Sequence, residues 1–452
     1  MLFCKSLLAG SLAGAPAITL DLADRPAGVM RILGHGPENG GSMGVPVCGG
    51  FDCDGDGYCE AAFAQFRASP AGRPGAGEVT VILGNGTIGG TLDAAIDQGG
   101  LLRVIGFQPY EATGSEIWMD DLTGEGRGDL LIGRQNHSLE FEPPVEPRAG
   151  CGALTIVVGS PEWRAQAARG TRLDLGSPPP GIKLITFVGP GNYDRLGIWF
   201  RTGDITGDGI ADLVVGADEV DAEGRGLGQN QGAAFVIRGG EHLLDCPDTV
   251  DLARLGQAEF PAGLRGHVAR IDAPAGADRF HLGATVQVGD LDGNGRAEVL
   301  LAATLNRVGA GLRLPGAPAG TGESAGGDRD GTVYIVWDEN FPPGPWPDHY
   351  RFSVDAPLLG QYTSINGGMQ ATSFGEEILA GQDYSGDGFA DLMIGDLAGD
   401  PFDRNNAGRA YVIYNVGHLR GQVINLDSPP AGFVHTVVSG AVPRAIAGDT
   451  AL

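Results

Sequence analysis

A nine-residue acidic segment occurs five times along this chain, and it constrains the fold more than any other feature of the sequence. Each copy follows the pattern D-x-(D/T/N/S)-G-(D/E/N)-G-x-x-(D/E), with oxygen-bearing side chains at positions 1, 3, 5 and 9 and glycine at positions 4 and 6. The copies span residues 52–60, 121–129, 204–212, 290–298 and 383–391. Because glycine tolerates positive φ angles, the pattern predicts a tight loop that turns its oxygen atoms inward.

Such a loop suits a hard cation, since Ca2+ takes about six to eight oxygen ligands. We expect side-chain ligands from positions 1, 3, 5 and 9. Position 7, whose side chains differ between copies, is expected to offer its backbone carbonyl. The candidate ligands are Asp52, Asp54, Asp56, Tyr58 and Glu60; Asp121, Thr123, Glu125, Arg127 and Asp129; Asp204, Thr206, Asp208, Ile210 and Asp212; Asp290, Asp292, Asn294, Arg296 and Glu298; and Asp383, Ser385, Asp387, Phe389 and Asp391.

The EF-hand is excluded, because its loop requires a bidentate Glu at position 12. Position 12 is apolar in every copy here: Phe63, Ile132, Val215, Leu301 and Ile394. A set of acidic turns without metal is the alternative. Five copies that keep all the ligand positions favour about five Ca2+ sites instead.

The composition narrows the class of partner. The formal charge of −26 argues against nucleic acid and anionic lipid surfaces. No stretch approaches the ~20 apolar residues of a membrane span, so we expect no membrane insertion. The 78 glycines and 29 prolines, with 42% hydrophobic residues, indicate a turn-rich all-β protein and not a disordered one.

Short apolar segments surround each acidic loop in a fixed order. A run such as LVVG at 213–216 or LMIG at 392–395 follows the loop, and a G-x-V-x-V segment begins at Gly77, Gly152, Gly232, Gly331 and Gly408. A strand with small residues precedes the loop, as in LGATVQVG at 282–289. A fourth segment, as in residues 172–187 and 423–438, is expected to be one strand leading to an outer edge. Four short strands per repeat predict a β-propeller blade, with the acidic loop joining its first and second strands.

This order of strand, acidic loop, L-x-(V/I)-G strand and G-x-V-x-V strand resembles the FG-GAP repeat, the calcium-binding blade of integrin α-subunit propellers. Residues 203–217 and 385–396 match the repeat best. The literal Phe-Gly pair occurs only at Phe374-Gly375, and the first repeat ends in EAAFAQF at 60–66. The resemblance implies five full blades with partial strands at the termini.

The ends of the chain suggest a larger parent. We expect 1–17 to be a weak signal-like or non-native start, 18–449 to be a single propeller, and 450–452 to begin a sixth acidic loop opened at Asp449. Residues 18–34 look like the fourth strand of a blade. A fragment of a six- or seven-bladed parent is the preferred reading, and an irregular closed ring is the alternative.

Other motifs carry less weight. Cys53 and Cys59, at positions 2 and 8 of the first loop, are candidates for a disulfide or for two separate thiols. The G-x-S-x-G sequence at 322–326 resembles a hydrolase elbow, but no helical pattern follows it. The Arg-Gly-Asp sequence at 127–129 shares its aspartate with the second loop. No catalytic residue is predicted.

These observations favour a non-catalytic, secreted or cell-surface propeller that Ca2+ stabilises and that acts as an adhesion module or as an interaction module for protein or carbohydrate. Sites of the extracellular class fill only where calcium is near millimolar. The alternative is the propeller part of a secreted hydrolase or lyase acting on polysaccharide or phospholipid. Fold does not decide between them.

Overall fold

A computed structural model describes residues 30–34, 43–86, 90–94, 100–140, 147–221, 228–304, 307–308, 331–368, 373–445 and 447. The predicted start at 1–17, the G-x-S-x-G sequence and Asp449 with the residues after it lie outside these ranges. The chain divides into two compact units. Unit 1 comprises 1–120, 127–131 and 157–184, and unit 2 comprises 121–126, 132–156 and 185–452.

Unit 1 contains a five-stranded sheet of order β10-β6-β4-β3-β2. Its strands are β2 (Val47–Gly49), β3 (Ala61–Gln65), β4 (Glu78–Ile82), β6 (Leu101–Ile105) and β10 (Leu173–Asp174). A separate parallel pair joins β1 (Met30–Leu33) to β5 (Gly90–Asp93), so the described end of the 18–34 segment is not the outer strand of a four-stranded blade. The described part of unit 1 also contains the helix α1 (Glu162–Ala168) and a 3-10 turn, η3 (Pro70–Gly72).

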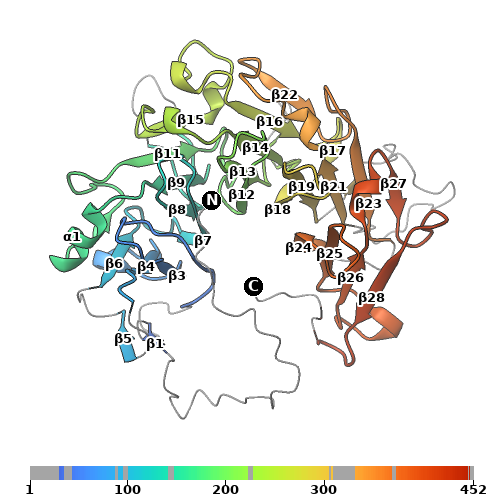
Figure 1. Ribbon diagram of the computed structural model, residues 1–452, viewed down its shortest axis with the longest axis horizontal. Helices are drawn as coiled ribbons and strands as arrows, with labels where there is room; N and C mark the ends of the chain where they lie inside the picture. Colours follow the sequence, from blue (N-terminus) through green and yellow to red (C-terminus); the bar gives the residue numbers. More distant parts are fainter. Residues whose placement is uncertain are drawn as a thin grey trace. The chain divides into compact units, whose positions relative to one another are not determined.

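A second five-stranded sheet has the order β15-β11-β9-β8-β7. It consists of β7 (Thr113–Asp120), β8 (Asp129–Arg134), β9 (Ala153–Val157), β11 (Leu184–Val188) and β15 (Thr249–Asp251). Figure 1 labels β3, β4 and β6 of the first sheet in blue and β7, β8, β9, β11 and β15 of the second in cyan to yellow-green.

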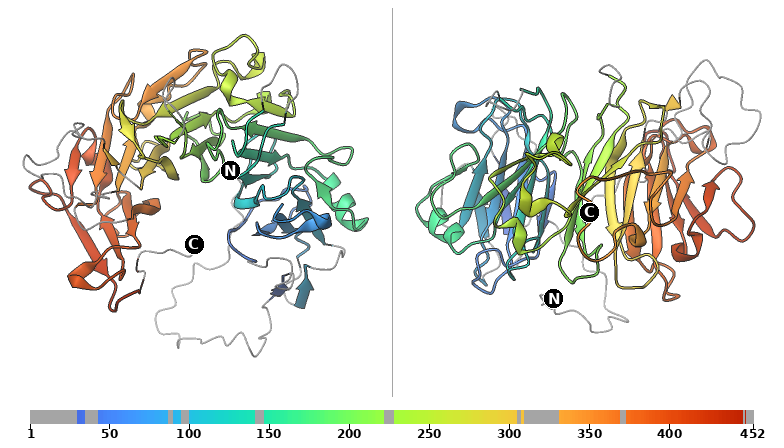
Figure 2. Two further views of the ribbon diagram at one scale, coloured as in Figure 1. Left: turned by 180° about the vertical axis from the view of Figure 1, so that it is seen from behind. Right: turned by 90° about the horizontal axis from the view of Figure 1, so that it is seen from above.

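Unit 2 contains three further sheets with a common plan. The first is β12 (Phe200–Gly203), β13 (Asp212–Ala217), β14 (Ala233–Ile237), β16 (Val268–Asp272) and β22 (Tyr350–Ser353). The second is β18 (Leu282–Gly289), β19 (Glu298–Ala303), β21 (Thr332–Val336), β23 (Tyr362–Asn366) and β27 (Val423–Asn425). The third is β24 (Phe374–Gln382), β25 (Asp391–Asp396), β26 (Arg409–Ile413) and β28 (His435–Ser439). Figure 2 shows these sheets from two further directions.

Short elements link the strands of unit 2. The pair β17 (Ala277–Asp278) and β20 (Arg307–Val308) is antiparallel. The 3-10 turns are η4 (Glu241–Leu243), η5 (Leu252–Arg254), η6 (Ala262–Leu264), η7 (Asp338–Asn340), η8 (Pro401–Asp403) and η9 (Val416–Leu419). In each of the three sheets the first four strands are antiparallel, as in a propeller blade.

The outer edge of a sheet differs from the sequence-based prediction. We expected 423–438 to form one strand, but the segment forms two strands in different sheets. β27 pairs in parallel with β23, whereas β28 pairs antiparallel with β26. The intervening Pro429 and Pro430 explain the break, because proline supplies no backbone donor to a ladder. The same division separates β10 from β11 within 172–187.

The cores of unit 2 lie between neighbouring sheets. One cluster joins residues of β13 and β14 to residues of β19 and β21, and it ends in the aromatic side chains of Phe341, Trp346 and Tyr350. A second cluster joins β19 and β21 to β25 and β26. Strand β19 takes part in both clusters, so both of its faces are covered, and every residue of β13 is buried as well. This burial explains why the two strands are continuous apolar runs without alternation. The all-β fold with blade-type sheets is confirmed.

Candidate metal centres

The acidic loops connect the first strand of a sheet to the second. The loop at 204–212 joins β12 to β13, and the loops at 290–298 and 383–391 lie at the corresponding places in the next two sheets. Within the third loop, Asp204 Oδ1 accepts hydrogen bonds from the backbone N–H of Gly207 at 2.6 Å and of Asp208 at 3.1 Å. Its Oδ2 accepts from the N–H of Gly209 at 2.8 Å. The position-1 carboxylate therefore holds the loop in its curl.

The same hydrogen bonds recur at Asp52, Asp121 and Asp383, and most of them recur at Asp290. The curl requires positive φ angles, which are +76° at Gly207 and +84° at Gly209. An L side chain is strained in that region, so the fixed glycines of the pattern have a backbone cause. Backbone donors at Asp383 also hold the pKa of its carboxyl below the usual value.

Side-chain oxygens of positions 1, 3 and 9 converge in two loops. One ligand atom from each of Asp52, Asp54 and Glu60 lies within 4.8 Å of the others. The corresponding residues of the fourth loop, Asp290, Asp292 and Glu298, form an equivalent group. Three carboxylates this close repel one another unless a cation or protons compensate them.

The position-9 residue is the most buried member of each group. Glu298 is fully buried; its Oε2 accepts from the N–H of Leu291 at 2.6 Å, while its Oε1 has no hydrogen-bond partner in the described structure. Burial raises the pKa of Glu298 to about 8 and that of Glu60 to about 7. An oxygen-only donor set with an unsatisfied buried carboxylate oxygen fits a hard divalent cation.

Position 9 also anchors the blade. Asp212 Oδ2 accepts from the N–H groups of Ile205 and Thr206 at 2.9 and 2.8 Å, and its Oδ1 accepts from the N–H of Gly239 at 3.0 Å. Its side chain thus ties the loop to the segment that follows β14. Burial raises the pKa of Asp212 to about 6.

Position 5 lies outside the convergent group in the first loop. Asp56 Oδ1 accepts from the N–H of Tyr58, and its Oδ2 pairs with Arg164 at 2.6 Å. Arg164 also lies 2.9 Å from Asp54. In the third loop, Asp208 Oδ2 pairs with Arg238 at 3.0 Å. Arginine side chains therefore neutralise part of the charge that we assigned to cation binding.

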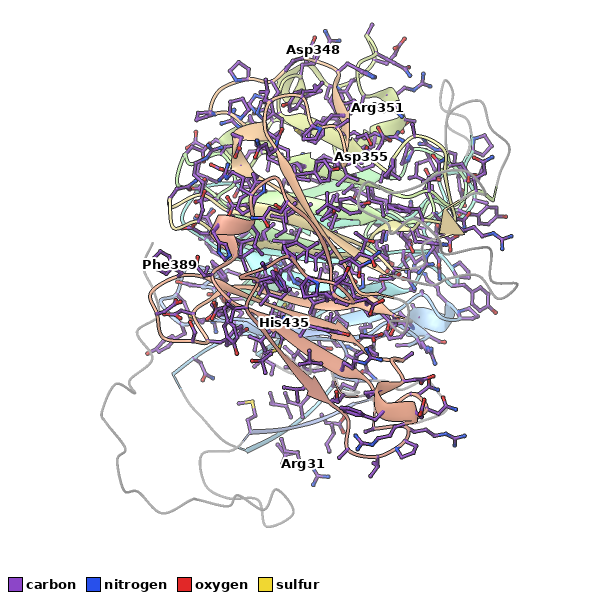
Figure 3. The ribbon with its side chains drawn as sticks, turned by 90° about the vertical axis from the view of Figure 1, so that its right-hand side faces the viewer. Arg31, Asp348, Arg351, Asp355, Phe389 and His435 are labelled. Carbon is purple, nitrogen blue, oxygen red and sulfur yellow. The ribbon has the colours of Figure 1, made fainter. Side chains whose placement is uncertain are left out.

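Position 7 has a role that the sequence did not reveal. The sequence pattern predicts that Ile210 and Arg296 bind calcium through their backbone carbonyls. In the structure, the side chains of both residues also pack on neighbouring loops. Ile210 lies against Gly124, where an added Cβ would be 2.9 Å from its Cδ1. Arg296 packs in the same way on Gly207 and donates to the carbonyl of Ile205. The glycine at position 4 thus makes room for the next loop, whereas Phe389 is 56% exposed (Figure 3).

The arginine contacts predict a measurable effect at Arg420. Its guanidinium pairs with Asp292 and Glu339 and lies 4.4 Å over the ring of Trp337. In chelator, we expect Arg420→Met to lower the free energy of unfolding by about 1–2 kcal/mol. Much of this loss should be recovered in millimolar calcium, because the bound cation then compensates the charge of Asp292. Chemical denaturation in both conditions measures this. Arg444→Met, at an exposed site, is the control variant. If Arg420→Met loses the same stability with and without calcium, the prediction is contradicted.

The raised pKa of Glu298 predicts a pH dependence. Its folded-state pKa of about 8 lies above the ordinary 4.5, so its contribution to stability is present below pH 4.5 and is lost as the pH rises toward 8. In chelator, the stability of the protein should therefore fall over this window. Glu298→Gln should reduce the dependence of stability on pH, and calcium should reduce the same dependence in the parent protein. Melting temperatures recorded in chelator from pH 5 to 8 measure this dependence. If the melting temperature falls equally with pH in the parent protein and in Glu298→Gln, Glu298 is ruled out as its source.

The predicted disulfide between Cys53 and Cys59 is wrong. Cys53 is fully buried and in no disulfide, and its Sγ lies 3.8 Å from the carbonyl oxygen of Phe51. Cys59 is only half-buried. Burial raises the pKa of the Cys53 thiol far above its usual range, so the thiol acts as a small core residue.

A third group of possible ligands lies in unit 2, at Asp218, Glu219 and His281. Arg195 lies 2.9 Å from Glu219 and 3.6 Å from Asp218. The guanidinium supplies the positive charge among these carboxylates, so the group is an ion-pair cluster at the end of β13.

The sheets and their loops define a repeat protein built from propeller-type blades. Residues 197–237 and 374–413 match the FG-GAP repeat family, so the chain contains FG-GAP repeats. These segments include the third and fifth acidic loops. No curated protein matches the chain in sequence.

Among solved structures, the rhamnogalacturonan lyase PL11 of Bacillus licheniformis matches with a TM-score of 0.33 and 12% identity. The match covers 76% of this chain and 45% of that lyase, so this chain spans less than half of the lyase's length. Across the described residues, no helix has the length and apolar character needed to cross a membrane.

Proposed function

We propose that this chain is a calcium-stabilised extracellular interaction module that binds protein or carbohydrate. The observation that carries the proposal is the convergence of carboxylates at positions 1, 3 and 9, with an unsatisfied oxygen on fully buried Glu298. Calcium would supply the positive charge that Arg164 and Arg420 provide only in part. The rest of each loop would supply the ligands that we assigned from sequence.

Calcium would act on the rigidity of the blades and not on a reaction. Position 1 holds the curl of the loop, and position 9 joins the loop to the segment after the third strand. A cation at this junction would fix the connection between three strands of a sheet. The same sites would be almost empty at cytosolic calcium, so the proposal includes an extracellular or cell-surface location.

Equilibrium dialysis against calcium tests the proposal directly. We expect about five bound ions per chain, with dissociation constants near 10⁻⁴ to 10⁻³ M. Binding of one ion or none would contradict it. Incubation with acidic polysaccharides and phospholipids tests the enzymatic alternative, and calcium-dependent product release would favour a hydrolase or lyase.

A further inference from the structure

The outer edge of β28 differs from the corresponding edges in unit 2. In the two preceding sheets, the fourth strand is paired in parallel with a fifth, because β22 covers β16 and β27 covers β23. Strand β28 is the fourth strand of its own sheet, and no strand among the described residues pairs with its far edge. An open edge of this kind presents backbone N–H and C=O groups that can pair with another chain.

The side chains of β28 are exposed where their counterparts are buried. Val438, Ile271 of β16 and Ile365 of β23 correspond to one another, because each pairs with the second residue of the third strand in its sheet. Both isoleucines are fully buried, whereas Val438 is 55% exposed and its neighbour Val437 is 42% exposed. The two buried positions owe part of their cover to the fifth strand, which β28 does not have among the described residues.

Strand β28 also lacks the features that protect an open edge. Its residues, from His435 (Figure 3) to Ser439, include no lysine, arginine, proline or glycine. Its pairing with β26 is regular and contains no bulge. Natural sheets use lysine, proline or a bulge to keep an edge from pairing with other chains. The edge of β28 is therefore suited to the addition of a strand.

The two covering strands define the kind of segment that fits such an edge. Phe352 of β22 is opposite Ile271, and Ile424 of β27 is opposite Ile365. The sequences that begin at these residues are FSVDAP and INLDSP. Both follow the pattern apolar-x-apolar-Asp-x-Pro, and both first residues are buried.

Backbone hydrogen bonds hold each covering strand in register. The N–H of Val354 donates to the carbonyl of Asp272 at 2.9 Å, and the N–H of Leu426 donates to the carbonyl of Asn366 at 3.0 Å. The carbonyl of Ser439 has the corresponding position in β28. In strand addition, main-chain hydrogen bonds supply affinity and alternate side chains supply specificity.

We propose that the edge of β28 binds an extended segment of a partner protein, which adds to the sheet as a parallel fifth strand and has the pattern apolar-x-apolar-Asp-x-Pro. Its first apolar residue lies opposite Val438, and the N–H of its second apolar residue donates to the carbonyl of Ser439. The inference rests on the interaction role proposed above and narrows the partner to a polypeptide.

Fluorescence anisotropy with a labelled peptide and the full chain in calcium tests this inference. The peptide GQVINLDSPP, a copy of residues 421–430, should bind. The same peptide with Ile424→Asp and Leu426→Asp should bind at least about tenfold more weakly, because a charge is costly to bury beside an apolar side chain. Methylation of the Leu426 nitrogen removes the backbone donor and should also weaken binding about tenfold. Absence of binding, or equal binding by the methylated peptide, overturns the proposal.

Two variants of the chain locate the binding edge. Val438→Asp should weaken peptide binding at least about tenfold. Val442→Asp places the same charge on an equally exposed valine beyond β28, so it should leave binding unchanged. Equal binding by the parent and Val438→Asp overturns the assignment to this edge. Melting curves of both variants report the fold, and the peptide variants keep the test decisive if Val438→Asp folds poorly.

Two further measurements separate this inference from its neighbours. Sedimentation equilibrium reports self-association, and a dimer that Val438→Asp dissociates would assign the edge to a second copy and overturn the partner segment. Equilibrium dialysis against calcium is carried out on the same samples. Loss of peptide binding with calcium binding intact overturns this inference alone, whereas loss of calcium binding contradicts the proposed function itself.

Discussion

Removing calcium with a chelator is expected to lower the free energy of unfolding by about 2 to 7 kcal/mol. A site with a dissociation constant of 10⁻⁴ to 10⁻³ M contributes roughly 0.4 to 1.4 kcal/mol at about 1 mM calcium, and five independent sites add up to this range. The loss is comparable with the whole net stability of many domains.

Thermal melting in chelator and in calcium measures this effect, with calcium-saturated chelator as the control for the chelator itself. The drop in melting temperature should reverse when calcium is returned in excess. The acidic groups make a large response physically reasonable, since Asp52, Asp54 and Glu60 meet within 4.8 Å. Unchanged melting would remove the calcium argument altogether.

The second large effect is expected for Asp212→Ala, which should destabilise the protein by about 3 to 5 kcal/mol in chelator as well as in calcium. The side chain is fully buried and accepts backbone hydrogen bonds from Ile205, Thr206 and Gly239. Removing it leaves three backbone donors without their acceptor, whichever ion is present.

Asp208→Ala is the matched comparison within the same loop. We expect it to lower the melting temperature in calcium and to weaken calcium binding. In chelator its effect should be small, about 1 kcal/mol or less, because its pairing with Arg238 is partly exposed. Denaturation of both variants in both conditions measures the difference. If Asp212→Ala destabilises only the calcium-loaded protein, position 9 is a ligand and not an anchor.

The sequence predicted the blade plan because the plan depends on local signals. The acidic loop between β12 and β13 requires glycines at 207 and 209, and the apolar run at 213–216 follows from a strand with both faces covered. The two FG-GAP matches confirm this part of the interpretation. The calcium sites themselves remain a prediction.

The arrangement of partners around each loop could not be predicted in this way. Arg164 reaches Asp56 from more than a hundred residues away in sequence, and Arg296 packs on Gly207 of another loop. The pairing of β22 with β16 likewise joins a segment of the fourth repeat to the sheet of the third. No local pattern contains such contacts, because neither partner needs the other for its own backbone conformation.

The sequence by itself therefore determined the repeated unit: the curled acidic loop, the strands on either side of it and the chemistry of its oxygen atoms. Local backbone sterics and the burial of short apolar runs are sufficient for that. The tertiary structure alone decided which of the loop carboxylates pair with arginine, and that Arg270 and Arg351 share Asp272. Those outcomes depend on the register between strands distant in sequence, which long-range packing sets.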